Sequence, residues 1–316
     1  MPNALVSHAT IATAHALIQP HIRTTPVMEL RRGALGGDWV PVLKCEFMQH
    51  AGSFKARGAF YNLLSRKVGP AGVAAASGGN HGAAVAHAAQ VLGHKARIFV
   101  PEISSPAKIA AIRRFGAEVV IGGARYDDAQ AACDAYVAES GALKVHPFSA
   151  VETIAGQGTL AREWQGQGEV DTVLIAAGGG GLISGVASWF AGSGTRVVGV
   201  EPAGSRALHA ALEAGGPVDV TVESVAADSL GARNVGELVH RICKDAVERV
   251  VLVADEAITQ AQKRLWQDFR IASEPGGAAA FGAALSGAYA PAPGERVGIL
   301  LCGGNVDLTK LAGIAA

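Results

Sequence analysis

The residue with the clearest chemical potential is Lys55, which lies in the segment Gly52-Ser53-Phe54-Lys55-Ala56-Arg57-Gly58-Ala59. The segment places the lysine at the predicted start of a helix, beside an aromatic ring and among small residues. Partial burial there would lower the pKa of the ammonium and make the amine nucleophilic. A lysine exposed to solvent at a helix start is the plain alternative, and Lys55 alone does not decide between them.

A second segment, Ser77-Gly78-Gly79-Asn80-His81-Gly82, follows the predicted strand Val73–Ala76 and leads into a helix. Backbone N–H groups at such a turn, together with the amide of Asn80, could hold a carboxylate or a ring hydroxyl. The segment is equally consistent with an ordinary turn and helix cap. His81, taken singly, is more often structural than catalytic.

The third segment is the run Gly178-Gly179-Gly180-Gly181, between the predicted strand Thr172–Ala176 and a helix that begins near Leu182. Backbone without side chains can close around a phosphate at this kind of turn. A turn with a purely structural role rarely needs so many consecutive glycines. The run therefore favours contact with a ligand.

The same glycines also invite a dinucleotide-binding interpretation, because Glu201 ends the next strand about 20 residues on, where a ribose-binding acid would stand. The fingerprint fails in detail, however. Its third glycine would fall at Ile183 or at Ser184, depending on where the motif starts. The interpretation also leaves Lys55 and the segment around Asn80 without a role.

Two further segments close the set of candidates. Leu301-Cys302-Gly303-Gly304-Asn305 ends the last predicted strand with a thiol and two glycines, and Ser273-Glu274-Pro275-Gly276-Gly277 opens a late helix. By default, Cys302 is a small residue of the hydrophobic core.

The elements that must position these residues alternate between short β-rich runs and longer helical patterns, which indicates an α/β fold with mostly parallel sheets. Several of the strands are apolar on both faces, as buried strands are. The predicted strands are Val73–Ala76, Ala96–Val100, Glu118–Ile121, Thr172–Ala176, Arg196–Val200, Val250–Val253 and Val297–Leu301. The predicted helices are Gly82–Leu92, Pro106–Phe115, Asp127–Glu139, Glu152–Trp164, Leu182–Phe190 and Glu256–Phe269.

Length and composition set the outer limits of the interpretation. A chain of 316 residues with 49% hydrophobic content can bury the cores of about two lobes. Lys and Arg together number 27, as do Asp and Glu, and without blocks of like charge nucleic acid and anionic membranes are poor partners. Polar residues interrupt the apolar ones from Met1 to Ala16, so a signal peptide is not expected, and no apolar stretch is long enough to predict a membrane span. The four cysteines are widely spaced, which predicts reduced thiols and a cytoplasmic location.

Together, these segments resemble the fold-type-II pyridoxal-phosphate enzymes, and most closely the serine/threonine dehydratase family with its serine racemase relatives. Gly52 to Ala59 resembles the cofactor-lysine motif, Ser77 to Gly82 the loop that binds the substrate carboxylate, Gly178 to Leu182 the phosphate cradle, and Cys302 to Asp307 the final strand. The four motifs occur in order and at similar spacing over nearly the whole chain.

The resemblance implies a tryptophan-synthase-β-like fold of type II with two open, mostly parallel sheets and pyridoxal 5'-phosphate in the cleft between two lobes. The larger lobe would comprise residues 1–45 and 145–316, and the smaller, substrate-closing lobe residues 46–144. Closure of the small lobe would expel water from the site. Enzymes of this kind are usually homodimers.

The resemblance also implies a role for each candidate residue. Lys55 would carry the cofactor as a Schiff base and act as the catalytic base, and the cofactor would further contact Phe54, Asn80, Gly178, Gly179, Gly180, Gly181, Leu182, Glu274 and Cys302. The substrate carboxylate would be held by Ser77, Gly78, Asn80 and His81. A neutral Cys302 beside the pyridine nitrogen would favour prompt β-elimination over transamination.

Two positions depart from the pattern of the serine racemases. Those enzymes resemble Ser-Ser-Gly-Asn-His where this chain has Gly78 at the second position, so racemisation is disfavoured. They also bind a divalent cation through the glutamate of a Glu-Pro motif and an acidic residue six positions later. This chain has Glu201-Pro202 but Ala207 at the later position, so no metal is expected and Glu201 remains a weak candidate.

The function expected from these residues is the conversion of a small β-hydroxy amino acid, such as L-serine or L-threonine, into a 2-oxo acid and ammonia. Within the same fold, a dehydratase of hydroxyaspartate or phenylserine and a β-replacement synthase remain open, with Arg125, Arg233 or Asp228 as residues that could face the substrate side chain. From other classes, a nicotinamide oxidoreductase and a non-catalytic amino-acid sensor remain open.

Overall fold

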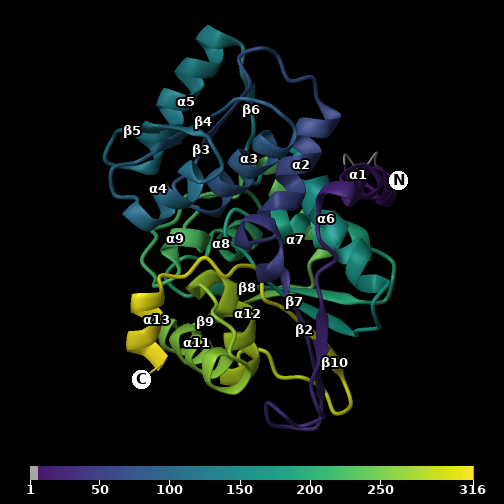
Figure 1. The fold of residues 1–316 in the computed structure, drawn as a ribbon. Coiled ribbons are helices and arrows are strands. Elements are labelled where there is room, and N and C mark those ends of the chain that lie inside the picture. Colours follow the sequence, from purple (N-terminus) through teal and green to yellow (C-terminus); the bar gives the residue numbers. More distant parts are fainter. Residues whose placement is uncertain (1–5, 316) are drawn as a thin grey trace.

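The structure, a computed structural model, describes residues 6–315 and consists of two mostly parallel sheets that are flanked by helices (Figure 1). The strands are β1 Val27–Glu29, β2 Val40–Lys44, β3 Val73–Ala76, β4 Ala96–Val100, β5 Glu118–Ile121, β6 Leu143–Lys144, β7 Thr172–Ala176, β8 Arg196–Pro202, β9 Arg249–Val253 and β10 Arg296–Leu300. The longer helices are α1 His8–Ile18, α2 Lys55–Ser65, α3 Asn80–Val91, α4 Pro106–Arg113, α5 Tyr126–Ser140, α6 Val151–Gln165, α7 Gly181–Phe190, α8 Ala207–Ala214, α10 Gly236–Ala246, α11 Asp255–Phe269, α12 Pro275–Ser286 and α13 Leu308–Ala315. Shorter helical turns are η1 Gln19–His21, η2 Glu46–Met48, η3 His50–Gly52 and α9 Ala227–Leu230.

The larger sheet has six strands in the order β1-β2-β10-β7-β8-β9, and only β1 runs antiparallel to its neighbour. Every residue of β7 is buried, which explains why this strand is apolar on both faces. The smaller sheet has the order β5-β4-β3-β6 and is parallel throughout. The expectation of two mostly parallel sheets is therefore confirmed.

The predicted elements all occur, and their ends differ by only a few residues. The strands at Val73–Ala76, Ala96–Val100, Glu118–Ile121 and Thr172–Ala176 have the predicted bounds. The last strand ends one residue earlier than predicted, at Leu300. The smaller sheet lies within the segment 46–144. The lobe boundaries after residues 45 and 144 stay a prediction.

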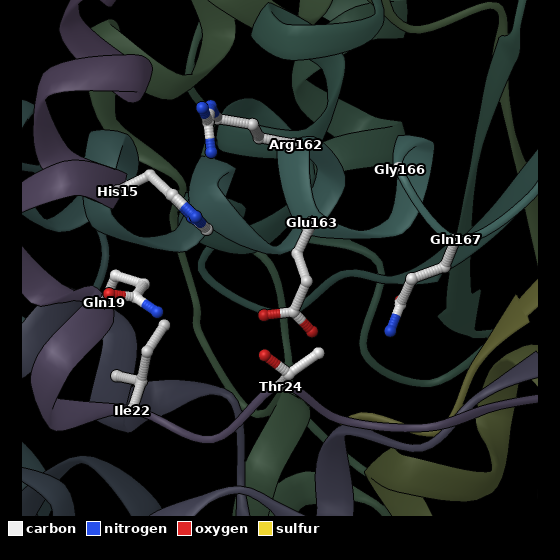
Figure 2. A pocket seen from close by; sticks show the side chains of 8 residues that line it. All are labelled: His15, Gln19, Ile22, Thr24, Arg162, Glu163, Gly166 and Gln167. Atoms are coloured by element: carbon white, nitrogen blue, oxygen red, sulfur yellow. The ribbon is translucent and has the colours of Figure 1, made fainter.

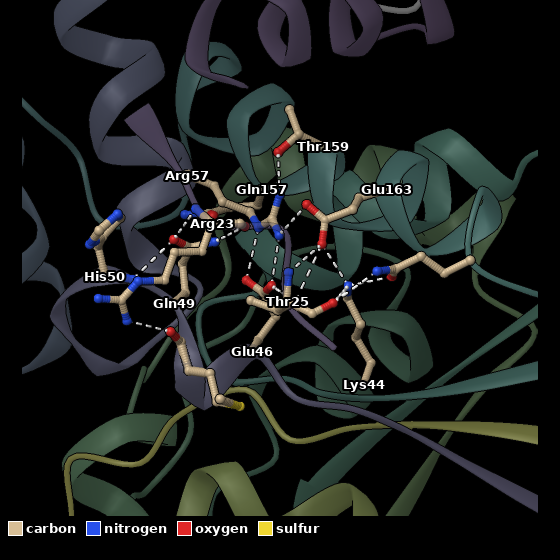
Figure 3. Close-up of polar contacts among 12 residues, drawn as sticks. Arg23, Thr25, Lys44, Glu46, Gln49, His50, Arg57, Gln157, Thr159 and Glu163 are labelled. Carbon is tan, nitrogen blue, oxygen red and sulfur yellow. Dashed lines mark hydrogen bonds and ion pairs between the residues drawn. The ribbon is translucent and has the colours of Figure 1, made fainter. Parts of the chain in front are cut away.

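A buried charge cluster joins α2 to the large sheet and to α6 (Figure 3). The guanidinium of Arg57 donates to both carboxylate oxygens of Glu46, at 2.8 and 2.7 Å, and to Glu163 at 2.9 Å. Lys44, at the end of β2, donates to Glu163 at 2.6 Å. The four charges are balanced and nearly inaccessible to solvent, so they fix the position of α2, which begins at Lys55.

We expect Arg57→Ala to lower the free energy of unfolding by about 3–5 kcal/mol, because the substitution leaves the buried carboxylate of Glu46 without its cationic partner and Glu163 with Lys44 alone. Arg32→Ala is the matched control, since Arg32 and Asp38 form an ion pair in which both side chains are more than half exposed. The control should cost less than about 1 kcal/mol. Urea unfolding of the three proteins measures both values, and equal losses would contradict the buried role.

A small polar cavity of about 270 Å3 lies beside this cluster (Figure 2). It is lined by His15, Gln19, Ile22, Thr24, Arg162, Glu163, Gly166 and Gln167. None of the candidate residues found in the sequence lies there. In the described part of the chain, no helix is long and apolar enough to cross a membrane.

Candidate active site

A second cavity, of about 720 Å3, lies between the two sheets and collects all the candidate residues for cofactor and substrate. Its lining includes Phe54, Lys55, Ser77, Gly78, Asn80, His81, Gly178, Gly179, Gly180, Gly181, Leu182, Glu274 and Cys302. These residues come from the ends of β3, β7 and β10 and from the starts of α2, α3, α7 and α12. In parallel sheets, ligands bind at such carboxyl ends of strands.

Lys55 is the first residue of α2, and it lies half-buried at the cavity wall, with its amine surrounded by protein. Its Nζ donates a hydrogen bond to the carbonyl oxygen of Pro147 at 2.8 Å and lies 5.3 Å from the centre of the Phe54 ring. Burial lowers the pKa of the amine to about 8, although the charge of Glu274 acts in the opposite direction. A substantial fraction of the amine is therefore neutral near physiological pH and able to attack a carbonyl carbon.

The segment before Lys55 is anchored to the end of β10. Ser53 and Gly303 form an antiparallel bridge, and the backbone N–H of Phe54 donates to the carbonyl oxygen of Cys302 at 3.2 Å. These bonds explain why two motifs almost 250 residues apart in the sequence meet at one wall of the cavity. Burial raises the pKa of the Cys302 thiol well above its usual range, so the thiol stays neutral.

The four-glycine turn is packed so closely that none of its positions has room for a side chain. A Cβ atom at Gly179 would lie 2.3 Å from the Phe148 ring, and one at Gly181 would lie 2.7 Å from the Phe148 backbone. Gly180 adopts a positive φ of 79°, which glycine tolerates without strain. Backbone alone therefore faces the cavity at the start of α7, where the first N–H groups have no acceptor within the helix.

Asn80 begins α3, and its amide lies between two other segments of the chain. Its Nδ2 donates to Glu274 Oε1 at 2.5 Å, and its Oδ1 accepts from Asn305 Nδ2 at 2.7 Å. Burial raises the pKa of Glu274. The sequence indicated Asn80 and Glu274 separately, but their contact and the part of Asn305 were not foreseen.

His81 offers less to a substrate than its position in the motif suggests. Its Nε2 is bound to the carbonyl oxygen of Val145 at 2.9 Å, and burial lowers the pKa of the ring to about 3. The imidazole is therefore uncharged and already partnered. The donors available to an anion at this end of α3 are therefore the backbone N–H groups, which have no acceptor within the first turn of a helix.

The space next to Gly78, where a side chain would lie, is taken by another residue. A Cβ atom there would lie 2.0 Å from Oγ of Ser104, which follows β4 and also lines the cavity. The space next to position 78 is thus filled by a hydroxyl from another loop. Sequence reasoning missed Ser104 because no motif surrounds it.

Both carboxylate oxygens of Glu201, the weak candidate for a metal ligand, are already hydrogen-bonded. Its two carboxylate oxygens accept hydrogen bonds from the backbone N–H groups of Leu208 at 2.9 Å and His209 at 2.8 Å, so the side chain caps α8. Burial raises the pKa of this carboxyl to about 7. Within residues 6–315, no group of three acidic, histidine or cysteine side chains could hold a metal ion.

The charged residues considered for the substrate side chain all lie at the cavity. Asp228 forms an ion pair at 2.9 Å with Lys108 of α4 and so connects the two sides of the opening. Arg125 and Arg233 are exposed members of the lining, one from each side.

Comparison with known proteins decides the family. A model of the family described as "Pyridoxal-phosphate dependent enzyme" matches residues 18–303. The chain belongs to this family. The resemblance seen in the motifs is thereby confirmed, as is pyridoxal phosphate as the cofactor of the enzyme.

Individual relatives agree with the dehydratase branch of the family. The enzyme is 38% identical to a phenylserine dehydratase of Ralstonia pickettii, covering 96% of this chain and 94% of that protein. It is 37% identical to an L-threonine ammonia-lyase of Geobacter sulfurreducens, covering 86% and 69%. The solved structure of maize serine racemase aligns with a TM-score of 0.91 at 34% identity, covering 98% of this chain and 96% of that one.

The residues of the cavity fit the cofactor. A buried amine with a lowered pKa suits the aldehyde, and a turn without side chains at a helix N-terminus suits the phosphate. Lys55, Phe54, Asn80, Gly178 to Leu182, Glu274 and Cys302 are the residues that would surround it.

The lowered pKa of Lys55 predicts how the cofactor-free enzyme captures pyridoxal phosphate. Only the neutral amine attacks the aldehyde, so the rate of capture should rise with pH and reach half its maximum near pH 8, the pKa of Lys55. Stopped-flow absorbance measures this rate. Dividing it at each pH by the rate constant for the neutral fraction of butylamine removes the ionisation of the cofactor itself and leaves that of Lys55. A midpoint near 10.4, the value of an ordinary lysine, would contradict the effect of burial.

Proposed function

We propose that this enzyme is an ammonia-lyase that removes water and then ammonia from a small L-β-hydroxy amino acid, such as serine or threonine, to give a 2-oxo acid. The observation that carries the proposal is the buried amine of Lys55, held between the glycine turn and the Ser77–Asn80 loop. The names of the dehydratase and ammonia-lyase relatives support the same reaction.

In this proposal Lys55 acts as the base of the reaction. Bound pyridoxal phosphate supplies an electron sink that makes the Cα–H bond of an attached amino acid acidic. With a substrate amino acid held at the cofactor, the free amine of Lys55 would take the Cα proton. Its lowered pKa suits this task, because an amine with a pKa near 8 is partly neutral at physiological pH and is still strong enough as a base.

The substrate carboxylate is bound, in this proposal, by the loop from Ser77 to His81. Ser77 Oγ accepts a bond from the backbone N–H of Gly79, and the first N–H groups of α3 have no acceptor within the helix. Because the imidazole of His81 is uncharged, backbone donors and the amide of Asn80 hold the anion. Movement of this loop with the small lobe, residues 46–144, would exclude water from the proton transfer.

Cys302 favours elimination over transamination. Its neutral thiol donates to the carbonyl oxygen of Gly276 at 3.5 Å, and its raised pKa means that it carries no charge. A neutral group at this wall cannot form an ion pair with a protonated ring nitrogen. A bound cofactor would therefore withdraw electrons from Cα less strongly, which would favour prompt loss of the β-hydroxyl.

Two finer features belong to the same proposal. The family resemblance supports a homodimer, and the four buried, unpaired cysteines support a reducing, cytoplasmic environment. Size-exclusion chromatography with light scattering tests the first, and fractionation of the producing cell tests the second.

The experiment that tests the function is a substrate screen of the enzyme loaded with pyridoxal phosphate, scored by the 2-oxo acid and ammonia released. It compares L- and D-serine, L-threonine, phenylserine and 3-hydroxyaspartate. We expect release from the L-β-hydroxy amino acids in a one-to-one ratio of the two products. An enzyme that carries the cofactor on Lys55 but releases neither product from any of these compounds would overturn the proposal.

A further inference from the structure

Asn305 joins three segments of the active site, although it lies outside the cavity. Its Nδ2 donates to the carbonyl oxygen of Ala51 at 2.8 Å and to Oδ1 of Asn80 at 2.7 Å. A Cβ atom at Gly52, whose φ is +75°, would lie 2.3 Å from Oδ1 of Asn305, so only glycine admits the side chain here. The loop before Lys55, the first residue of α3 and the end of the β10 segment meet at this one amide.

The directions of these hydrogen bonds follow from the groups at the two ends. The carbonyl oxygen of Ala51 can only accept, so Asn305 must turn its NH2 group toward it. The second hydrogen of the same NH2 group is donated to Asn80, which must accept it with its Oδ1 oxygen. The NH2 group of Asn80 is consequently directed the other way, toward the Glu274 carboxylate and the cavity.

We propose that Asn305 is a positioning residue that fixes the orientation of the Asn80 amide, so that Asn80 presents a donor and not an acceptor to an anionic oxygen in the cavity. The inference rests on the proposed function, in which that oxygen is the ring oxygen of pyridoxal phosphate. A terminal amide turns over at little cost when nothing distinguishes its two ends. Asn305 distinguishes the two ends from outside the site by donating to Oδ1 of Asn80, and Glu274 accepts from the NH2 group at the other end.

The inverted amide would have a measurable cost. Exchanging a donor for an acceptor beside a charged oxygen removes one charge-assisted hydrogen bond and sets lone pairs against negative charge. The dissociation constant of the cofactor should then rise by about 10- to 100-fold. A donor at the ring oxygen also competes with the proton on the nitrogen that links Lys55 to the cofactor, so its loss should raise the pKa of that nitrogen.

Asn305→Asp is the decisive variant, because it keeps the shape of the side chain and removes its N–H groups. We expect weaker binding of pyridoxal phosphate and an upward shift, by about one unit, of the pH at which the visible band of the lysine-bound cofactor changes. Asp307→Ala is the matched control in the same segment, since Asp307 bonds only to the first turn of α13. It should change neither quantity.

A double-mutant cycle with Asn80→Ala separates positioning from the effect of an added negative charge. If Asn305 acts through Asn80, Asn305→Asp shifts the pH midpoint in the parent and not in the Asn80→Ala background. An equal shift in both backgrounds, or no shift in the parent, overturns the inference. Asn305→Ala repeats the cycle without a charge and serves if the aspartate variant folds poorly.

Neither readout requires turnover, so failure here is distinguishable from failure of the proposed function. A parent enzyme that forms the visible band but releases no 2-oxo acid refutes the proposed activity and leaves the role of Asn305 testable. A parent that turns over serine while Asn305→Asp leaves both readouts unchanged refutes only the role of Asn305.

Discussion

Lys55→Ala is expected to abolish the visible absorbance band of the bound cofactor and to lower the release of 2-oxo acid from serine by at least about 10^3-fold. The substitution removes the amine that forms the covalent link and, in the proposed mechanism, the base that takes the Cα proton. Proton transfer by a positioned base alone is worth about 10^2- to 10^4-fold, and loss of the covalent link adds to this. Absorbance spectra and a coupled assay for 2-oxo acid measure the two effects.

Lys67→Ala is the matched control for loss of a lysine, since Lys67 is exposed just beyond α2. It should retain the band and the parent rate. The fold of Lys55→Ala should persist, because the buried ammonium is itself costly and its removal leaves only the carbonyl oxygen of Pro147 without a donor. A variant that lacks Lys55 but turns over serine at the parent rate would rule out the assignment.

The sequence was most informative where local chemistry alone decides the structure. The strand Thr172–Ala176 could be predicted to the residue because it is buried on both faces and ends at glycines. The candidate residues of the cavity could be grouped because their segments follow strand ends or open helices. Backbone N–H groups are free at such helix starts whatever the rest of the fold does.

The elements that were missed depend on partners distant in the sequence. β2 contains Pro41 and ends at Lys44, neither of which is typical of a buried strand. Lys44 is nevertheless fully buried, because its ammonium forms an ion pair with Glu163, 119 residues away in the sequence. Hydrophobic periodicity carries no information about such a pair.

The contacts within the site were unpredictable for the same reason. The sequence indicates that His81 is close to the substrate, but Nε2 of its ring is already hydrogen-bonded to the carbonyl oxygen of Val145. Nothing near Ser104 indicates that its hydroxyl fills the space beside Gly78. Only Asn305 left a usable signal, because an asparagine after two glycines at a strand end is a typical position for a side chain that bonds to backbone.

The second large effect is expected for Gly181→Ala in the glycine turn. Alanine for glycine in a helix usually stabilises by up to about 1 kcal/mol. Here the new Cβ atom would lie 2.7 Å from both Cα and the carbonyl oxygen of Phe148, and backbone atoms cannot turn aside. The turn must therefore move away from the segment that also carries Pro147, the partner of Lys55. Overpacking of this kind costs about 1–3 kcal/mol.

We expect Gly181→Ala to raise the dissociation constant of pyridoxal phosphate by about 10- to 100-fold and to lower the thermal midpoint of the cofactor-free protein. Gly313→Ala is a control of opposite sign, because Gly313 lies in α13 with no atom within 4 Å of the added Cβ. It should leave cofactor binding unchanged and stabilise the protein slightly. Fluorescence titration and calorimetry separate the two effects. If Gly181→Ala lowers the thermal midpoint but binds the cofactor like the parent, the glycines are needed for packing alone, and the phosphate lies elsewhere in the cavity.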